Sequence, residues 1–281
     1  MSVAAPFALS RPGGGLLRGL VDLPEASGRH PAVVICHGFK GFMEWGFFPA
    51  LAELLAQRGI VAVRFNLSGA GMQPGDERVT DPGAFRDDTY SAELADLRLV
   101  LEATGEVIAP GRVDRGRVGL FGHSRGGAAA ILAAAGDGWR ERVLALVTWA
   151  AISHVDRYSP EEKSLWRETG ELPVVNSRTG QQLALGHGLL EDVERNAAGS
   201  LDLLAAAGRR AAPWLIVHGA DDESVPAAEA AELDARATGT HELLLIPGAG
   251  HTFGVRHPFA GPTPYLIEAL NATQTWFRRY L

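Results

Sequence analysis

One serine lies between glycines where a strand could turn sharply into a helix. Gly122-His123-Ser124-Arg125-Gly126 follows the apolar run Val118–Phe121 and leads into the small-residue stretch Gly126–Ala135. Glycines two positions before and after the serine let neighbouring strands and the helix approach, so that Ser124 projects from the turn. The start of the helix would offer unpaired N–H groups and a partial positive charge to an oxyanion. The pattern predicts a serine nucleophile, and the simpler interpretation is a glycine-rich turn.

A serine hydroxyl is a weak nucleophile and needs a histidine base that a carboxylate orients. Downstream, the apolar run Trp214–His218 is followed by Gly219-Ala220-Asp221-Asp222-Glu223. The spacing His-Gly-x-x-Asp-x-x-Val-Pro favours Asp222 as this carboxylate, with Asp221 as the second candidate. Both could instead cap the helix that follows.

The candidate base follows the next apolar run, Glu242–Ile246, which ends in Pro247-Gly248-Ala249-Gly250-His251. His251 therefore lies on a loop directly after a predicted strand, and the chain order is Ser, Asp, His, as a serine hydrolase of this kind requires. His257, six residues later, is the competing candidate.

An oxyanion needs a second amide beside that of Arg125, the residue after the nucleophile. The run Ala32–Cys36 ends in His37-Gly38-Phe39, and the glycine would let the backbone approach a substrate carbonyl. We therefore expect the Phe39 amide to be the second donor. His37 is better explained as a structural hydrogen-bonding residue than as a second base.

Aromatic residues gather after this loop and could wall an acyl or aryl pocket, although they could equally belong to the core. The side chains that we expect to line a substrate pocket are His37, Phe42, Trp45, Trp149 and Trp166.

Apolar runs alternate with segments of helical periodicity along the whole chain, which predicts an α/β fold with a parallel sheet covered on both faces. We treat residues 1–281 as a single domain. The predicted strands are Ala32–Cys36, Ile60–Phe65, Val118–Phe121, Val143–Thr148, Trp214–His218 and Glu242–Ile246, after an N-terminal hairpin around Leu16–Leu23. The predicted helices are Pro49–Arg58, Ala84–Thr104, Gly126–Ala135, Ala227–Ala237 and Pro264–Tyr280.

One stretch, Ser153–Ser200, breaks this alternation, because it is rich in charge and glycine and contains no clear strand. Its place directly after a predicted core strand favours a lid or cap over the pocket rather than a surface excursion.

The composition narrows the function further. The chain of 281 residues has a formal net charge of −7 and a hydrophobic content of 46%. No clustered basic face suggests a nucleic-acid partner, no apolar run suggests a membrane span, and no His or Cys spacing suggests a metal site. With one cysteine and no recognisable signal peptide, we expect a cytoplasmic enzyme that acts on a small-molecule ester.

Together these segments resemble the α/β-hydrolase superfamily across nearly the whole chain. His37-Gly38-Phe39, Gly122-His123-Ser124, His218-Gly219 with Asp222, and Gly250-His251 look like its carboxylesterase and cinnamoyl (feruloyl) esterase branch, with dienelactone hydrolases and prolyl-oligopeptidase-type domains as neighbours. The resemblance implies an eight-stranded, mostly parallel sheet, an acyl-enzyme mechanism and no cofactor. A peptidase, a thioesterase or a C–C bond hydrolase would carry the same motifs.

The chain departs from the family pattern after its second core strand. The usual Asp-x-Arg/Asn-Gly-His-Gly is replaced here by Asn66-Leu67-Ser68-Gly69-Ala70-Gly71, which keeps glycines but lacks the aspartate and the histidine. This change affects a supporting loop and leaves the predicted nucleophile, acid and base in place.

Overall fold

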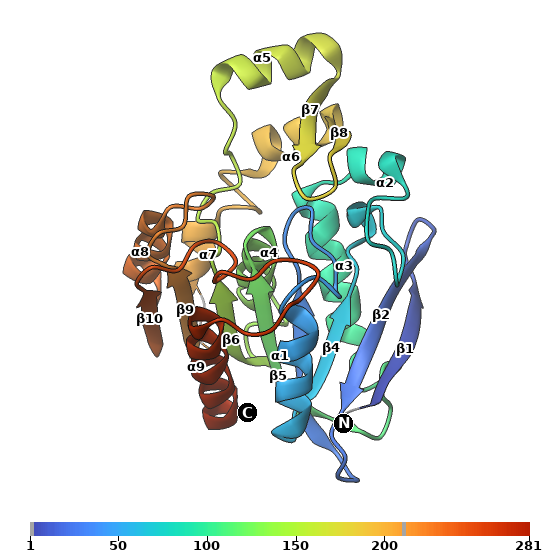
Figure 1. Ribbon diagram of the computed structural model, residues 1–281, viewed down its shortest axis with the longest axis vertical. Coiled ribbons are helices and arrows are strands. Elements are labelled where there is room, and N and C mark those ends of the chain that lie inside the picture. Colours follow the sequence, from blue (N-terminus) through green and yellow to red (C-terminus); the bar gives the residue numbers. More distant parts are fainter. Residues whose placement is uncertain (1–2, 210–211) are drawn as a thin grey trace.

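A mixed sheet of eight strands forms the centre of the molecule (Figure 1). The computed structural model describes residues 3–209 and 212–281. The strands follow the spatial order β1-β2-β4-β3-β5-β6-β9-β10, and all neighbours from β4 to β10 are parallel. The predicted α/β fold with a mostly parallel sheet is therefore confirmed. The strands are β1 (Val3–Ser10), β2 (Leu16–Leu23), β3 (His30–Cys36), β4 (Val61–Phe65), β5 (Val113–His123), β6 (Val143–Trp149), β9 (Trp214–Gly219) and β10 (His241–Ile246).

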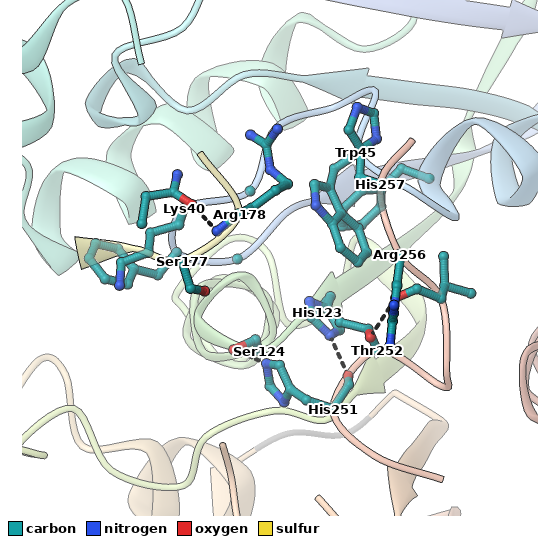
Figure 2. Close-up of a pocket in the computed structure, with 16 residues that line it drawn as sticks. Lys40, Trp45, His123, Ser124, Ser177, Arg178, His251, Thr252, Arg256 and His257 are labelled. Atoms are coloured by element: carbon teal, nitrogen blue, oxygen red, sulfur yellow. Dashed lines mark hydrogen bonds between the residues drawn. The ribbon is translucent and has the colours of Figure 1, made fainter. Parts of the chain in front are cut away.

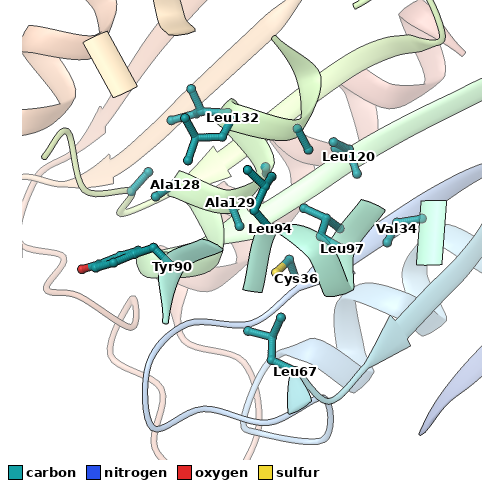
Figure 3. Close-up of a cluster of buried hydrophobic side chains, with 14 of the residues drawn as sticks. Val34, Cys36, Leu67, Tyr90, Leu94, Leu97, Leu120, Ala128, Ala129 and Leu132 are labelled. Atoms are coloured by element: carbon teal, nitrogen blue, oxygen red, sulfur yellow. The ribbon is translucent and has the colours of Figure 1, made fainter. Parts of the chain in front are cut away.

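Helices cover both faces of this sheet, because its central strands are apolar on both sides. In β3, Val33 and Ile35 face one core, while Val34 and Cys36 face the other. Helices α1 and α9 pack on the first face, and α3, α4, α7 and α8 on the second, where Figure 3 shows the packed side chains of α3, α4 and the strands. The helices are α1 (Phe48–Gln57), α2 (Pro82–Arg86), α3 (Tyr90–Ala103), α4 (Arg125–Ala134), α7 (Leu203–Arg209), α8 (Ala227–Arg236) and α9 (Pro264–Tyr280).

The single helix predicted over Ala84–Thr104 is wrong, because the structure contains two helices there. The short α2 ends at Arg86, and α3 starts at Tyr90 after an extended Thr89. The Thr89 hydroxyl accepts a hydrogen bond from the Ala92 amide at 3.1 Å, which caps α3. Thr89, which lies inside a stretch of helical periodicity, therefore marks the start of a new helix.

The segment between β6 and β9 rises above the sheet at the top of Figure 1. It contains α5 (Pro160–Thr169), the antiparallel hairpin of β7 (Glu171–Asn176) and β8 (Gln181–Gly186), and α6 (His187–Asn196). The prediction that Ser153–Ser200 holds no strand is therefore wrong. These strands pair only with each other and bury only part of their length, so neither shows the continuous apolar run of a core strand.

Side-chain hydrogen bonds of Gln181 and Asp192 help to fix the hairpin and α6 to the rest of the chain. The Gln181 side chain accepts a hydrogen bond from the Val79 amide at 3.0 Å and donates one to the Val79 carbonyl at 2.9 Å. Asp192 of α6 accepts from the amide and hydroxyl of Ser91 at the start of α3. Within the described residues, no helix is long and apolar enough to cross a membrane.

Candidate active site

Ser124 lies at a sharp turn between β5 and α4, with an unusual backbone conformation of φ 56° and ψ −122°. Such a conformation costs about 1 to 3 kcal/mol, so surrounding contacts must impose it. A Cβ atom on Gly122 would lie 2.3 Å from the Gly126 carbonyl oxygen, and one on Gly126 would lie 2.2 Å from the His37 carbonyl oxygen. Only glycine fits at these two positions, which explains the motif.

The three side chains that the sequence singled out meet at the carboxyl end of the sheet. The Ser124 hydroxyl lies 3.1 Å from His251 Nε2, and His251 Nδ1 lies 2.8 Å from Asp222 Oδ2 (Figure 2 shows the serine and the histidine). The buried Asp222 requires a proton on His251 Nδ1, so Nε2 is free to accept the proton of the serine. Asp221, the second candidate, is exposed.

Hydrogen bonds hold the Asp222 carboxylate in its ionised form. Its Oδ1 accepts from the amides of Ser224 and Val225 at 2.8 and 2.9 Å, and its Oδ2 also lies 3.3 Å from His218 Nε2. Burial alone would raise the pKa of Asp222, but the bonds from His218 and His251 outweigh burial and hold that pKa well below its usual range. The carboxylate is therefore negative at neutral pH.

The two predicted amide donors belong to residues close to the serine: Arg125 follows it in the chain, and Phe39 lines the same cavity. Gly38–Gly41 form a turn in which the Gly41 amide donates to the Gly38 carbonyl at 3.0 Å, and among the described residues no hydrogen bond from the Phe39 amide is found. Arg125 is the first residue of α4, and its amide has no acceptor within the helix. A Cβ atom on Gly38 would lie 2.9 Å from Ser124 Cβ, which shows how closely this loop approaches the serine.

A cavity of about 410 Å³ opens above Ser124. Its floor is made by His123, Ser124 and His251, and Trp45 and His257 lie on one side of it (Figure 2). The turn of the β7–β8 hairpin lies on the other side. The inserted segment therefore contributes directly to the wall of the cavity.

Of the five predicted pocket residues, only Trp45 lines this cavity. The prediction is wrong for the other four, because their side chains are buried in the packed interior. Each of them is at most 2% exposed: His37, Phe42, Trp149 and Trp166. His37 Nδ1 donates to the Gly38 carbonyl and its Nε2 accepts from the Leu67 amide, so it holds two loops together, as its structural interpretation expected. His257 is bound to Gly46 and Glu77 at the cavity wall.

Sequence reasoning missed two histidines that support the site. His123 Nε2 donates to the His251 carbonyl at 3.0 Å, and His218 Nε2 donates to the Val225 carbonyl at 2.8 Å. Each therefore fixes a loop that carries the acid or the base. Their only signal in the sequence was their place inside the two motifs, directly at the ends of β5 and β9.

Two buried histidines give the protein a predictable sensitivity to acid. Burial lowers the pKa of His37 to about 4 and that of His123 to about 3. In the unfolded chain these groups bind protons below about pH 6.5, so the free energy of unfolding falls as the pH drops from about 6.5 toward these folded values. At pH 4.5 we expect a loss of about 2 to 3 kcal/mol for each histidine. Urea unfolding at pH 7 and 4.5 measures it.

The slope of the free energy of unfolding against pH separates the contribution of His37 from other effects of acid. His37→Gln should flatten the dependence of the free energy of unfolding on pH, whatever it does to stability at pH 7. His187→Gln, which changes a half-exposed histidine on α6, is the matched control and should keep the slope of the wild type. Equal slopes for all three proteins would contradict the assignment.

Behind the nucleophile, the Arg125 side chain is buried between two carboxylates. Its Nε donates to Glu93 at 2.7 Å and its Nη2 to Asp88 at 3.0 Å, and its guanidinium lies 4.0 Å from the centre of the Tyr90 ring. Burial raises the pKa of both Glu93 and Asp88, although the charge of Arg125 opposes it. The cluster ties the first residue of α4 to α3 and so fixes the turn at Ser124.

Removing this arginine should destabilise the protein strongly. Arg125→Met leaves two buried carboxylates unpaired, and we expect a loss of about 3 to 5 kcal/mol in urea unfolding. Adding Glu93→Gln should recover part of the loss, because it removes one buried charge. Arg115→Met breaks an exposed pair with Glu106 and should cost less than about 1 kcal/mol. Equal costs for the two arginines would contradict the role of burial.

Comparison with known proteins identifies the family of this chain. The sequence matches the alpha/beta hydrolase family over residues 33–261, and the chain belongs to that family. It is a hydrolase of the α/β-hydrolase type. Over 206 residues it is 25% identical to 2,6-dihydropseudooxynicotine hydrolase of Paenarthrobacter nicotinovorans, a match that covers 72% of this chain but only 47% of that protein.

Solved structures share the fold over nearly the full chain. Est1E from Butyrivibrio proteoclasticus with bound ferulic acid aligns with a TM-score of 0.73 and 22% identity, over 94% of this chain and 95% of that one. A dienelactone hydrolase from Anabaena variabilis aligns with a TM-score of 0.64 and 20% identity, over 99% of both chains. At these identities the likeness concerns the fold.

Proposed function

We propose that this protein is a serine hydrolase that cleaves carboxylic esters of small to medium acyl or aryl groups. The observation that carries the proposal is that both ring nitrogens of His251 are engaged, one by the Ser124 hydroxyl and one by the buried Asp222, on the floor of an open cavity. A serine, a neutral histidine and a buried carboxylate in this order activate an alcohol for attack on a carbonyl.

The reaction takes two steps. Ser124 Oγ attacks the ester carbonyl while its proton moves to His251 Nε2, and the amides of Phe39 and Arg125 stabilise the oxyanion. His251 then gives the proton to the leaving alcohol, and an acyl-enzyme remains. Water attacks this acyl-enzyme with His251 as base, which releases the acid and restores the serine. Asp222 stabilises the charged imidazolium in both steps.

The size and walls of the cavity support the substrate class. A volume of about 410 Å³ fits a small or medium ligand, and the partly exposed side chains of Phe39 and Trp45 offer aromatic surface. Est1E, which shares the fold, binds the aromatic ferulic acid. We propose that the inserted segment acts as a cap that shapes this pocket, because the turn of its hairpin lines the wall.

Two assays test the proposal. The folded wild-type protein should be labelled covalently by a fluorophosphonate probe. A panel of 4-nitrophenyl esters, aminoacyl anilides and acyl-CoA thioesters should then show the highest kcat/KM for the esters. Failure of the folded protein to label would exclude the serine mechanism, whereas a preference for anilides or thioesters by orders of magnitude would replace the ester by that substrate class.

A further inference from the structure

The wall of the cavity carries an unbalanced positive charge. Three cationic side chains line it, those of Lys40, Arg178 and Arg256, and none of the described residues that line it carries a carboxylate. In Figure 2, Lys40 and Arg178 lie together on one side of the cavity, and Arg256 lies on the other. Asp222 is bonded to His251 and Glu77 to His257, and neither carboxylate lines this wall.

Arg178 lies on the turn of the β7–β8 hairpin, and its backbone is fixed by a bond from its amide to the Asn176 side chain at 3.2 Å. The guanidinium lies 5.3 Å from the centre of the Phe42 ring, and its Nη2 atom is buried with no hydrogen-bond partner in the described structure. Burial lowers the pKa of Arg178, and the nearby Glu77 only partly offsets this effect. Glu77 is itself exposed and bound to His257.

Lys40, in the Gly38–Gly41 turn, is also a cation that is partly buried at the cavity wall. Its ammonium donates to the Val175 carbonyl at 2.9 Å and lies 5.0 Å from the centre of the Phe39 ring. Lys40 is half-buried and forms no ion pair within the described residues, and burial lowers its pKa. Two cations are thus partly removed from water, and neither forms an ion pair within the described residues, which is costly unless a ligand supplies the opposite charge.

We propose that the preferred substrates are esters that carry a carboxylate, which Arg178 and Lys40 bind on the hairpin side of the cavity while Ser124 attacks the ester bond. Arginine suits this role because its planar guanidinium can bind a carboxylate through two parallel hydrogen bonds. The inference rests on the proposed esterase function and adds to it the charge of the substrate.

Matched substrate pairs test the proposal. The mono-4-nitrophenyl ester of adipic acid carries the carboxylate in its acyl half, and 4-nitrophenyl hexanoate is its neutral partner. 4-Acetoxybenzoate carries it in the alcohol half, and 4-acetoxybenzamide is neutral. In at least one pair, wild-type kcat/KM for the acid should exceed that for the neutral ester by about tenfold or more, as a charged hydrogen bond allows. The preferred pair identifies which half carries the charge.

The variants separate charge from general damage. Arg178→Gln should lower kcat/KM for the acidic ester about tenfold more than for its neutral partner. Arg178→Lys should restore part of the preference, because it keeps the charge. Arg195→Gln removes an exposed arginine from α6 of the same inserted segment and should leave the preference unchanged. Wild-type preference for the neutral ester in both pairs, or equal losses in Arg178→Gln, would overturn the proposal.

A binding measurement distinguishes this failure from a failure of the esterase function. Calorimetry should show that adipate or 4-hydroxybenzoate binds the Ser124→Ala protein and that Arg178→Gln in the same background weakens binding about tenfold or more. Fluorophosphonate labelling and turnover of neutral esters without any binding of either acid would overturn the charge inference alone. Absence of both labelling and turnover would instead reject the serine esterase.

Discussion

Ser124→Ala should abolish labelling by a fluorophosphonate and lower kcat/KM for 4-nitrophenyl esters by about 10⁴-fold or more. The expected loss is large because the variant removes the atom that forms the acyl-enzyme, while His251 and Asp222 keep their own hydrogen bond. Any remaining activity would come from the amides of Phe39 and Arg125 acting on a bound ester attacked directly by water. Steady-state kinetics and intact-protein mass spectrometry after labelling measure the two effects.

A second serine on the cavity wall provides the control. Ser177 lies on the hairpin turn, and neither His251 nor any other base is bonded to it in the described structure. Ser177→Ala should still be labelled by the probe. Labelling that survives Ser124→Ala but disappears in Ser177→Ala would show that the nucleophile lies on the hairpin turn and would refute the proposed mechanism.

Asp222→Asn should lower kcat by about 10³ to 10⁴-fold with little change in fold. The substituted amide can donate a hydrogen bond toward His251 Nδ1, which favours the proton on Nε2, and a protonated Nε2 cannot accept the serine proton. The two backbone bonds from Ser224 and Val225 reach the other oxygen and can persist. The expected result is therefore a folded protein with a histidine in the wrong tautomer.

The adjacent acid supplies a control of the same charge. Asp221→Asn changes an exposed carboxylate one residue away and should keep activity within a few fold of the wild type. The double variant Ser124→Ala with Asp222→Asn should be no less active than Ser124→Ala alone, because the residues act as one unit. A larger loss in Asp221→Asn than in Asp222→Asn would contradict the assignment of the acid.

The core strands could be predicted because each is a short, continuous apolar run between turn residues. Val118–Phe121 and Trp214–His218 have this pattern, and both lie in strands that have a neighbouring strand on each side. The hairpin of the inserted segment could not be predicted in this way. Its strands bury only part of their length, and Pro173 interrupts the first, so the local pattern is not that of a sheet.

In the site, too, one part could be predicted from the sequence and another could not. Ser124, Asp222 and His251 could be placed near one another because each follows a predicted strand, and parallel strands end at one edge of a sheet. The cavity wall could not be placed, because an aromatic residue beside a motif can face either the substrate or the core. Trp149 and Trp166 face the core, whereas Arg178 reaches the cavity through a hairpin whose position depends on tertiary contacts.

The β7–β8 hairpin is a separate two-stranded sheet, and none of its residues belongs to the strands that carry Ser124, Asp222 or His251. Its turn, residues 177–180, can therefore vary in length and charge without moving the reacting atoms. In evolution or in a designed library, substrate selectivity and the rate of the chemical step would depend on mutations at different positions in the chain. Diversifying this turn alone is a direct route to new selectivity with an unaltered reaction centre.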